Sequence, residues 1–526
     1  MMGGENGWLD ERDGAEQGGA EQLGCANCGS EQGGGTNCGA EQDGCANCAA
    51  EQGGGINCGA LIDRGAEQWQ IFQRGEGGTA AIWLEGSYVV TRLSPDVPVR
   101  FGDPGAGGVK VFARAVQEDS GAEAVPWQAC ALLPGRRWET VLRAVPTGGP
   151  YRLETRMEYD GWDGLSVTRG DMIHHVGVGD VFVVAGQSNA CGRALTPICD
   201  PPELGVHMYR YSGRWDLAAH PLDEATGAVY FGNYSNHNPG HSPFLHMAKL
   251  LRRALGCPIG LVMAPYGGSP LSWWNPDENG ALADNMLRML RGAGVTPRAM
   301  LWYQGEAEGY VGGAPDYLER FSAFAAHVRE RLGQPELPVF TAQLNRCLNE
   351  ISEPLDRAWG QVRQAQRAAA ERVPGVFVVP ANDLPLYDAA HLAPEGNLRL
   401  GERFAAALLG ALHGRGADWR APEPKRAVRV SPCRVRLEFA HVRNRLDAFG
   451  APAALLPIEA EDADGFVPLA AYAAERDALV LDFARPPAPG AVLHGAWRMN
   501  PGAAIPQDLG RMPMLSFYGL PIEPQE

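Results

Sequence analysis

The sequence is short of lysine, of long apolar runs and of one familiar catalytic motif. Of its 526 residues only Lys110, Lys249 and Lys425 are lysine, and the formal net charge is −17. An acidic protein of this kind lacks the cationic surface that attracts nucleic-acid phosphates, so we expect no nucleic-acid partner. No apolar run approaches the ~18 residues that cross a bilayer, so we expect no membrane segment. The motif G-x-S-x-G is missing, which excludes the nucleophile elbow of the α/β-hydrolases.

The first residues, MMGGENGWLDERDG, contain neither a basic stretch nor an apolar core. Both are features of a secretory signal, so we expect a cytoplasmic protein. The distribution of the twelve cysteines agrees with a reducing compartment, because six of them lie singly and far apart. We expect these six to be reduced thiols: Cys130, Cys191, Cys199, Cys257, Cys347 and Cys433.

A repeat rich in glycine occupies the N-terminal tail, which we place at residues 1–65. EQLGCANCGSEQGGGTNCGA is followed by EQDGCANCAAEQGGGINCGA, a 20-residue period. So few apolar side chains cannot offset the entropy lost on ordering, which predicts disorder. The two C-x-x-C pairs leave zinc binding as an alternative, since thiolates at that spacing can share a tetrahedral ion. No helix or strand pattern flanks the pairs, which favours disorder.

Three patterned segments follow the tail. Residues 66–176 and 421–526 consist of short strand-like runs between turn residues, which is typical of small all-β domains. Residues 177–415 alternate strand-like and helical runs, such as DVFVVAG (180–186) and SPFLHMAKLLRRALG (242–256). Repeated strand–helix units predict a parallel sheet covered by helices on both faces. We therefore predict an α/β protein, with a three-layer α/β/α central domain flanked by two small all-β domains.

Residues that could take part in catalysis follow the predicted strands of the central segment. One strand runs into Ser188, the next into Gly267-Gly268 and a third into Gln304, while Asp388 and His391 follow the last. Ligands of open parallel sheets bind beyond the carboxyl ends of the strands, so we expect these residues at one edge. A serine, backbone donors, an amide and a D-x-x-H pair are the components of acyl transfer. Each alone could be structural, but their joint placement favours a catalytic site.

Four short motifs carry a family resemblance: GQSN at 186–189, GGS at 267–269, WYQGE at 302–306 and D-x-x-H at 388–391. Together they resemble the sialate O-acetylesterase and carbohydrate esterase family six branch of the SGNH hydrolases. The resemblance covers about residues 177–413, and it implies a flavodoxin-like catalytic domain that removes acetyl groups from a carbohydrate. It implies an acetylated sugar as the partner and neither a metal nor an organic cofactor.

The same resemblance implies the roles of the site residues. Ser188 would be the nucleophile, His391 the general base and Asp388 the residue that orients it, acting through an acetyl-enzyme intermediate. The oxyanion hole would consist of the backbone N–H groups of Ser188 and Gly268 and the side-chain amide of Gln304. The neighbouring side chains expected to support the site are Asn189 and Glu306.

Several assignments have competitors. Asp383 is a rival for the acid of the triad, but the D-x-x-H spacing favours Asp388. Trp273 and Trp274 are candidates for contact with the sugar, although packing in the core is the more common fate of such side chains. Arg193 is a candidate partner for a sialate carboxylate.

A metal site is a further alternative, suggested by the histidines of NHNPGH, His237 and His241. This segment contains Pro and Gly and lacks nearby carboxylates, so we interpret it as a loop.

Other functions remain open at this point. One is a non-catalytic sugar-binding protein on the same scaffold, which would have no need to keep Ser188, Asp388 and His391 together. Others are an acetylxylan esterase, a different SGNH ester hydrolase, and a lipid or thioester hydrolase. GQSN and WYQGE stand in place of a GDSL-type block, which disfavours the last. The sequence names neither the acetylated sugar nor the oligomeric state.

Overall fold

The computed structural model describes residues 59–89, 108–161, 164–232, 240–416 and 418–524. The Gly- and Cys-rich repeat, with its C-x-x-C pairs, lies outside the described residues, so the prediction of disorder remains a prediction. Of the helices in these ranges, none is both long and apolar enough to cross a membrane. Strand β1 (Gly59–Arg64) begins inside the segment assigned to the tail, because its residues pair antiparallel with β3 (Thr79–Val89).

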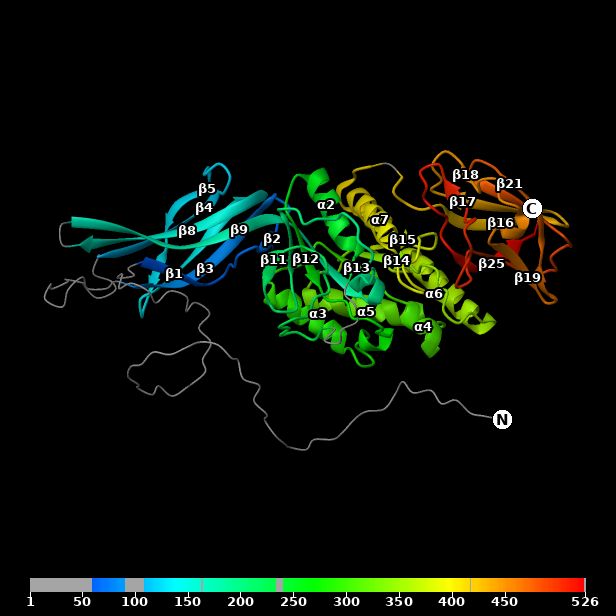
Figure 1. The fold of residues 1–526 in the computed structure, drawn as a ribbon, viewed down its shortest axis with the longest axis horizontal. Coiled ribbons are helices and arrows are strands. Elements are labelled where there is room, and N and C mark those ends of the chain that lie inside the picture. Colours follow the sequence, from blue (N-terminus) through cyan, green and yellow to red (C-terminus); the bar gives the residue numbers. More distant parts are fainter. Residues whose placement is uncertain (1–58, 90–107, 162–163, 233–239, 417, 525–526) are drawn as a thin grey trace, which may run out of the picture. The chain divides into compact units, whose positions relative to one another are not determined.

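Antiparallel strands make up the first described part of the chain (blue to cyan in Figure 1). One sheet has the order β1-β3-β7-β6, with β7 at Arg137–Pro146 and β6 at Ala131–Leu133. Strands β4 (Val109–Gln117), β5 (Glu123–Ala129) and β8 (Gly148–Gly161) pair beside it. Apolar side chains from both groups, among them Leu84, Val111, Trp138 and Leu153, form one buried cluster.

Strand β9 (Gly164–Gly186) is continuous across the position between 176 and 177, where we predicted a domain boundary. Its first part pairs antiparallel with β8, and its last part pairs parallel with β12 (Ile259–Met263) and β13 (Ala299–Tyr303). The short strand β2 (Ile71–Gln73) also pairs with it. Gly177 and Gly179 resemble turn residues in the sequence, but here they allow close packing, because a Cβ on Gly177 would collide with Ile71 and one on Gly179 with Pro258.

The central sheet has the strand order β11-β10-β12-β9-β13-β14-β15. The remaining strands are β10 (Val206–Tyr209), β11 (Trp215–Leu217), β14 (Val339–Gln343) and β15 (Val376–Pro380). All neighbours are parallel except β10 and β11. Every residue of β12, β13 and β14 is buried, as expected for parallel strands covered on both faces. The predicted mixed α/β class is confirmed.

Helices connect these strands: α2 (Pro243–Leu255), α3 (Ala281–Gly292), α5 (Tyr317–Leu332), α6 (Glu353–Arg372) and α7 (Pro394–His413). Helix α2 packs against α7, while α3 packs against α5 and α5 against α6. In Figure 1 α2 and α7 are drawn above the strands, and α3 and α5 below them. Helix α2 begins after Ser242 and ends at Gly256 in a left-handed conformation, as its sequence predicts.

The C-terminal part contains an eight-stranded sheet in the order β20-β19-β23-β25-β16-β17-β22-β21. Strand β17 (Arg434–Ala440) alternates between buried and less buried residues, which is typical of a sheet with one face in a core. Arg363, fully buried on α6, donates hydrogen bonds to Ala496 O and Arg498 O of this part. The other strands of the sheet are β16 (Glu423–Ser431), β19 (Ile458–Asp462), β20 (Gly465–Val467), β21 (Leu469–Ala474), β22 (Ala478–Phe483), β23 (Val492–Gly495) and β25 (Phe517–Glu523). A separate pair is formed by β18 (Leu446–Asp447) and β24 (Gln507–Asp508).

Candidate active site

The carboxyl ends of three neighbouring strands, β12, β9 and β13, are joined by backbone hydrogen bonds. Gln187 N donates to Tyr303 O at 2.8 Å, and Tyr266 N donates to Gly186 O at 2.8 Å. Gly186 has φ +127°, and a Cβ at this position would collide with Tyr303 O, so only glycine fits. The chain therefore turns sharply after β9 and places Ser188 as the first residue of helix α1 (Ser188–Cys191).

Two backbone N–H groups near this turn lack partners within the residues that the structure describes. Neither the N–H of Ser188 nor that of Gly268 donates a hydrogen bond there. Gly268 has φ +70°, and no atom lies within 4 Å of the place a Cβ would take, so its surroundings are open. Unpaired N–H groups in the loops after adjacent strands suit the stabilisation of an oxyanion.

Asp388 and His391 form a close pair on the loop after β15. His391 Nδ1 lies 2.7 Å from Asp388 Oδ2, while Asp388 Oδ1 accepts hydrogen bonds of 2.8 Å from the N–H groups of Ala390 and His391. Burial alone would raise the pKa of Asp388, but these hydrogen bonds outweigh it and hold the pKa below its ordinary value. The carboxylate is thus ionised at neutral pH and fixes the orientation of the imidazole.

The side chain of Asn189 ties this loop to helix α1. Its Nδ2 donates to Ala390 O at 3.2 Å, and its Oδ1 accepts from Leu392 N at 3.1 Å, so Asn189 holds both neighbours of His391. Asn345 adds a second hydrogen bond to Ala390 O, at 2.9 Å. In the described part of the chain no hydrogen bond joins the Ser188 hydroxyl to the His391 ring. Such catalytic contacts often tighten only when substrate binds.

Asp383, the rival for the triad acid, is engaged elsewhere. Its two carboxylate oxygens accept hydrogen bonds of 2.7 Å from the guanidinium of Arg403 on α7. This bidentate pair ties the loop after β15 to the helix that follows it. Asp388 instead contacts His391 directly, and its role as the acid of the triad stays a prediction.

Gln304 does not present a free donor in this structure, contrary to our expectation. Its side chain is fully buried, and Nε2 donates to Ser269 O at 3.3 Å and to the carboxylate of Glu308. The reason is local, because helix α4 (Glu306–Val311) begins two residues later and places Glu308 one turn from the amide. Oε1 has no hydrogen-bond partner among the described residues.

Glu306 is buried beside Asn189, with 7% of its surface exposed. Its Oε1 accepts a hydrogen bond of 2.7 Å from Asn189 Nδ2, and its Oε2 has no partner in the described ranges. Burial raises the pKa of Glu306 to about 7, although the bond from Asn189 opposes this shift. Glu306 therefore contacts Asn189, the residue that connects Ser188 to the loop of His391, and its role in support of the site stays a prediction.

The two adjacent tryptophans have different surroundings. Trp274 is fully buried, donates from Nε1 to Ser269 Oγ at 3.0 Å and packs edge-on against Trp302 at 5.1 Å. Its prediction as a sugar contact is therefore wrong, because core packing takes the whole ring. Trp273 is 39% exposed and lies 5.7 Å from the ring of Tyr266, so it remains a candidate.

The guanidinium of Arg193 is not exposed on the surface of the site, where it could bind an anion. Its guanidinium is buried and forms an ion pair of 2.8 Å with Asp223, which is itself buried. The negative charge of Asp223 is thus matched within the protein. The expected role of Arg193 in holding a sialate carboxylate finds no support in this geometry.

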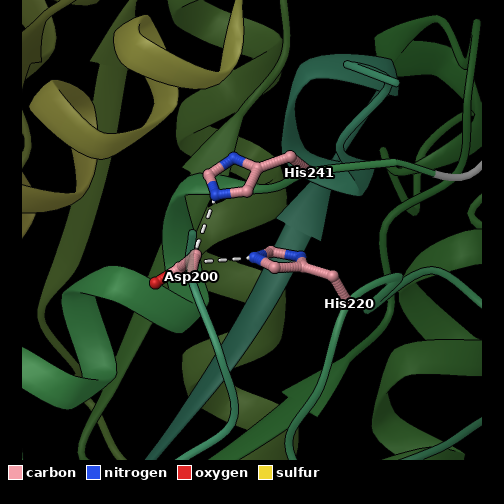
Figure 2. A group of neighbouring side chains, drawn as sticks. All are labelled: Asp200, His220 and His241. Atoms are coloured by element: carbon pink, nitrogen blue, oxygen red, sulfur yellow. Dashed lines mark hydrogen bonds and ion pairs between the residues drawn. The ribbon is translucent and has the colours of Figure 1, made fainter. Parts of the chain in front are cut away.

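A second Asp–His group consists of Asp200, His220 and His241 (Figure 2). His220 Nε2 and His241 Nε2 both point to Asp200 Oδ2, at 3.0 and 3.1 Å. Three potential metal ligands therefore lie within 4.8 Å of one another, and the expectation that His241 has no carboxylate partner is wrong. Lys249, however, donates from its ammonium group to the other oxygen of Asp200 and already neutralises it. A divalent cation would meet this fixed positive charge, so the donor set fits a metal poorly. His237 lies outside the described residues.

No role was assigned from the sequence to two residues that shape the site, Asn345 and Gln187. Asn345 follows β14, and the rule that located the other loops would have found it had it been applied to PVFTAQLN (338–345). Gln187 Oε1 accepts from the N–H groups of Gly305 and Ala307, each at 3.3 Å, but a side chain that binds a distant loop leaves no local signal.

Comparison with known proteins finds similarity to carbohydrate esterases. Residues 178–410 match the family model described as carbohydrate esterase, sialic acid-specific acetylesterase. The chain is 25% identical to the sialate O-acetylesterase of Homo sapiens over 334 residues, which are 54% of this chain and 61% of that protein. It is also 25% identical to that of Pongo abelii over 297 residues, 47% of this chain and 54% of the relative. The chain thus spans little more than half the length of the curated relatives it matches.

A solved structure shares the fold over most of the chain. The carbohydrate acetylesterase from Xanthomonas citri matches with a TM-score of 0.59 at 20% identity, covering 86% of this chain and 97% of the other.

Proposed function

We propose that this chain, whose residues 178–410 belong to the sialic acid-specific acetylesterase family of carbohydrate esterases, hydrolyses O-acetyl esters on sugars. One observation carries the proposal. Asn189, adjacent to Ser188, holds both neighbours of His391, and Asp388 orients that histidine. A reactive hydroxyl and an oriented imidazole are thus fixed to each other through a single side chain.

The reaction follows from these positions. The Ser188 hydroxyl attacks the acetyl carbonyl, and His391 takes its proton on Nε2 while Asp388 holds the Nδ1–H. The N–H groups of Ser188 and Gly268 donate to the oxyanion. When the tetrahedral intermediate collapses, the sugar oxygen leaves with the proton from His391. Water then attacks the acetyl-enzyme in the same way and releases acetate, so every step uses side chains and backbone N–H groups of this chain together with water.

Gln304 can serve as a third donor after one rearrangement. Burial raises the pKa of Glu308, which favours its neutral, protonated form. A neutral Glu308 can donate to Gln304 Oε1 once the amide rotates by half a turn, and this rotation releases the Nε2–H groups from both Glu308 and Ser269 O. We propose this orientation for the complex with the transition state.

The domain arrangement of the proposal follows the sequence prediction. The central part, residues 177–415, would be a three-layer α/β/α catalytic domain, and the strands of 66–176 and 421–526 would form the flanking all-β domains. Residues 1–58, which precede strand β1, would be a disordered tail, and the protein would act in the cytoplasm.

Acetate release from O-acetylated sialosides, acetylated xylo-oligosaccharides and a simple aryl acetate tests the proposed function. The wild-type protein should release acetate from at least one carbohydrate ester. Ser188→Ala should lower the rate by roughly 10⁴- to 10⁶-fold. Ser322→Ala, on α5 away from the site, is the matched control and should keep full activity. A Ser188→Ala protein that keeps more than a tenth of the rate would refute the nucleophile.

A further inference from the structure

We infer that the active site binds a neutral sugar ring on an aromatic platform formed by Phe231, Tyr266 and Trp273. This inference rests on the proposed function and deepens it, because it names the substrate class. The three rings are in contact in series: Phe231 stacks on Tyr266 at 5.0 Å between centroids, and Tyr266 lies 5.7 Å from Trp273. Phe231 is 42% exposed and Trp273 39% exposed.

The platform adjoins the reacting groups. The backbone of Tyr266 is bonded to Gly186 O, two residues before Ser188, and Tyr266 itself precedes Gly268 by two residues. A sugar ring on these faces therefore lies beside the nucleophile and the proposed oxyanion donors. Aromatic faces suit the C–H faces of a pyranose, because both surfaces are apolar while the sugar hydroxyls stay at the edge.

Buried polar groups hold the platform rigid. Asn285 of α3, which is itself buried, accepts from Phe231 N at 3.0 Å and donates to Phe231 O at 2.7 Å. On the other side Trp274 is anchored in the core, and Leu271 N donates to Glu308 at 2.7 Å. Trp273 lies in the sequence between Leu271 and Trp274, the two residues held in this way. Exposed rings that are already fixed lose little entropy when a ligand binds, which is a property of a binding surface.

The charge around the platform argues for a ring without a carboxylate. The described segments that form this region, 215–232, 240–248, 264–287, 303–319 and 381–398, contain neither lysine nor arginine, but many acidic residues. A sugar carboxylate is best recognised by a bidentate arginine. Arg193 is already paired with Asp223, and Arg320 is bound to Glu278 at 2.7 and 2.9 Å. Arg288, the residue after 264–287, donates from its guanidinium to Asn285 Oδ1 at 3.1 Å, and Arg346 donates its Nε to Leu384 O.

Kinetics with paired substrates test the charge half of this inference. The wild-type enzyme should prefer acetylated xylo-oligosaccharide to an O-acetylated sialoside, and should act at least fivefold faster on the carboxyl methyl ester of that sialoside than on the free acid. Added salt should narrow this gap, because it screens repulsion. Preference for the free acid, lost in Arg346→Ala, would overturn the inference.

Trp273→Ala tests the platform half. It should raise KM for acetylated xylo-oligosaccharide by about tenfold, and by clearly less for an aryl acetate. Trp83→Ala is the matched control, because Trp83 is 40% exposed on β3, away from the site, and it should change neither value. An equal loss on both substrates, or no loss, would overturn the platform.

Binding separates this inference from the proposed function. Isothermal titration with deacetylated xylo-oligosaccharide needs no catalysis, and Trp273→Ala should weaken that binding about tenfold. If the wild-type protein bound the oligosaccharide but released no acetate from any ester, the function would fail and the platform would stand. If it released acetate but Trp273→Ala bound normally, the platform would fail and the function would stand.

Discussion

Two Asp–His groups in this molecule use the same side chains for different purposes. In one, Asp388 and His391 are 45% and 26% exposed at the side chain, and backbone N–H groups complete the carboxylate's bonds. In the other, Asp200 is 2% exposed and is surrounded by His220, His241 and Lys249. Similar composition therefore does not imply similar chemistry, and exposure and charge balance decide between the two.

The ring nitrogen that meets the carboxylate is the second difference. His391 uses Nδ1, which leaves Nε2 available to exchange a proton with a serine and a leaving group. His220 and His241 use Nε2, and their Nδ1 atoms are buried without a partner in the described residues. Neither can pass a proton to substrate. The Asp200 group instead connects the loop after helix α1 to helix α2, which carries Lys249.

Removing one histidine from each group should give the largest difference in activity between the two groups. His391→Ala should lower acetyl-ester hydrolysis by about 10⁴-fold or more, because the serine loses its base. His241→Ala should lower it by less than tenfold, since His241 contacts no reacting atom. Initial rates with an aryl acetate measure both. Comparable losses in the two variants would show that the Asp200 group takes part in catalysis.

Replacing the two aspartates near His391 separates orientation from loop anchoring. Asp388→Asn should keep the melting temperature and lose up to about 10⁴-fold in kcat, because the imidazole can adopt the wrong tautomer. Asp383→Asn should chiefly lose stability, because it breaks the bidentate pair with Arg403. Thermal unfolding and kcat for both variants give the answer. An inactive, stable Asp383→Asn beside an active Asp388→Asn would exchange their roles.

Asp200→Asn should lower the free energy of unfolding, whereas Asp388→Asn should leave it unchanged. It leaves the buried ammonium of Lys249 uncompensated, which typically costs about 3–5 kcal/mol in free energy of unfolding. Burial raises the pKa of Asp200, but hydrogen bonds from His220, His241, His246 and Lys249 outweigh it and hold the pKa below its ordinary value of 3.8.

The stabilising effect of Asp200 is therefore present above its unfolded-state pKa and is lost as pH falls through the lower, folded-state value. Urea denaturation should show a constant difference between wild type and Asp200→Asn from pH 5 to 8, which closes only in stronger acid. A difference that vanished already at pH 5 would contradict this.

Glu306→Gln should produce the smallest change, visible as a pH dependence. The pKa of Glu306 rises from 4.5 to about 7 on folding, so the wild-type protein loses stability as pH rises through this interval. The loss amounts to about 3 kcal/mol, at 1.36 kcal/mol per pKa unit. Glu306→Gln cannot ionise and should lack this part of the slope. Parallel urea titrations at pH 5, 6, 7 and 8 measure it, and identical slopes in both proteins would rule out the buried neutral form.

The sequence predicted what depends on local pattern. Apolar strands followed by Ser188, Gly268 and Gln304 led to a mixed α/β fold with these residues after neighbouring strands, and the structure has that fold. The resemblance that GQSN and WYQGE carry is also confirmed, because residues 178–410 match the model of that family. The catalytic roles of the individual residues stay predictions.

What the sequence did not predict depends on contacts between distant segments. Trp273 and Trp274 are neighbours of the same residue type in the sequence. Trp274 packs against Trp302 in the core, and this contact distinguishes the buried ring from the exposed one. Asp200 lies about twenty residues before His220 and forty before His241, so their association has no local pattern. The bond of Gln304 to Ser269, which lies 35 residues earlier, likewise required the loops to be placed.

The central claim is that Ser188 is the nucleophile and that His391 activates it. Inactivation with diethyl p-nitrophenyl phosphate, followed by peptide mass spectrometry, tests it directly, because this reagent phosphorylates an activated serine. We predict one diethylphosphoryl group per chain, on Ser188, formed in step with the loss of activity, absent in Ser188→Ala and greatly slowed in His391→Ala. Complete inactivation with the label on another residue would contradict the account.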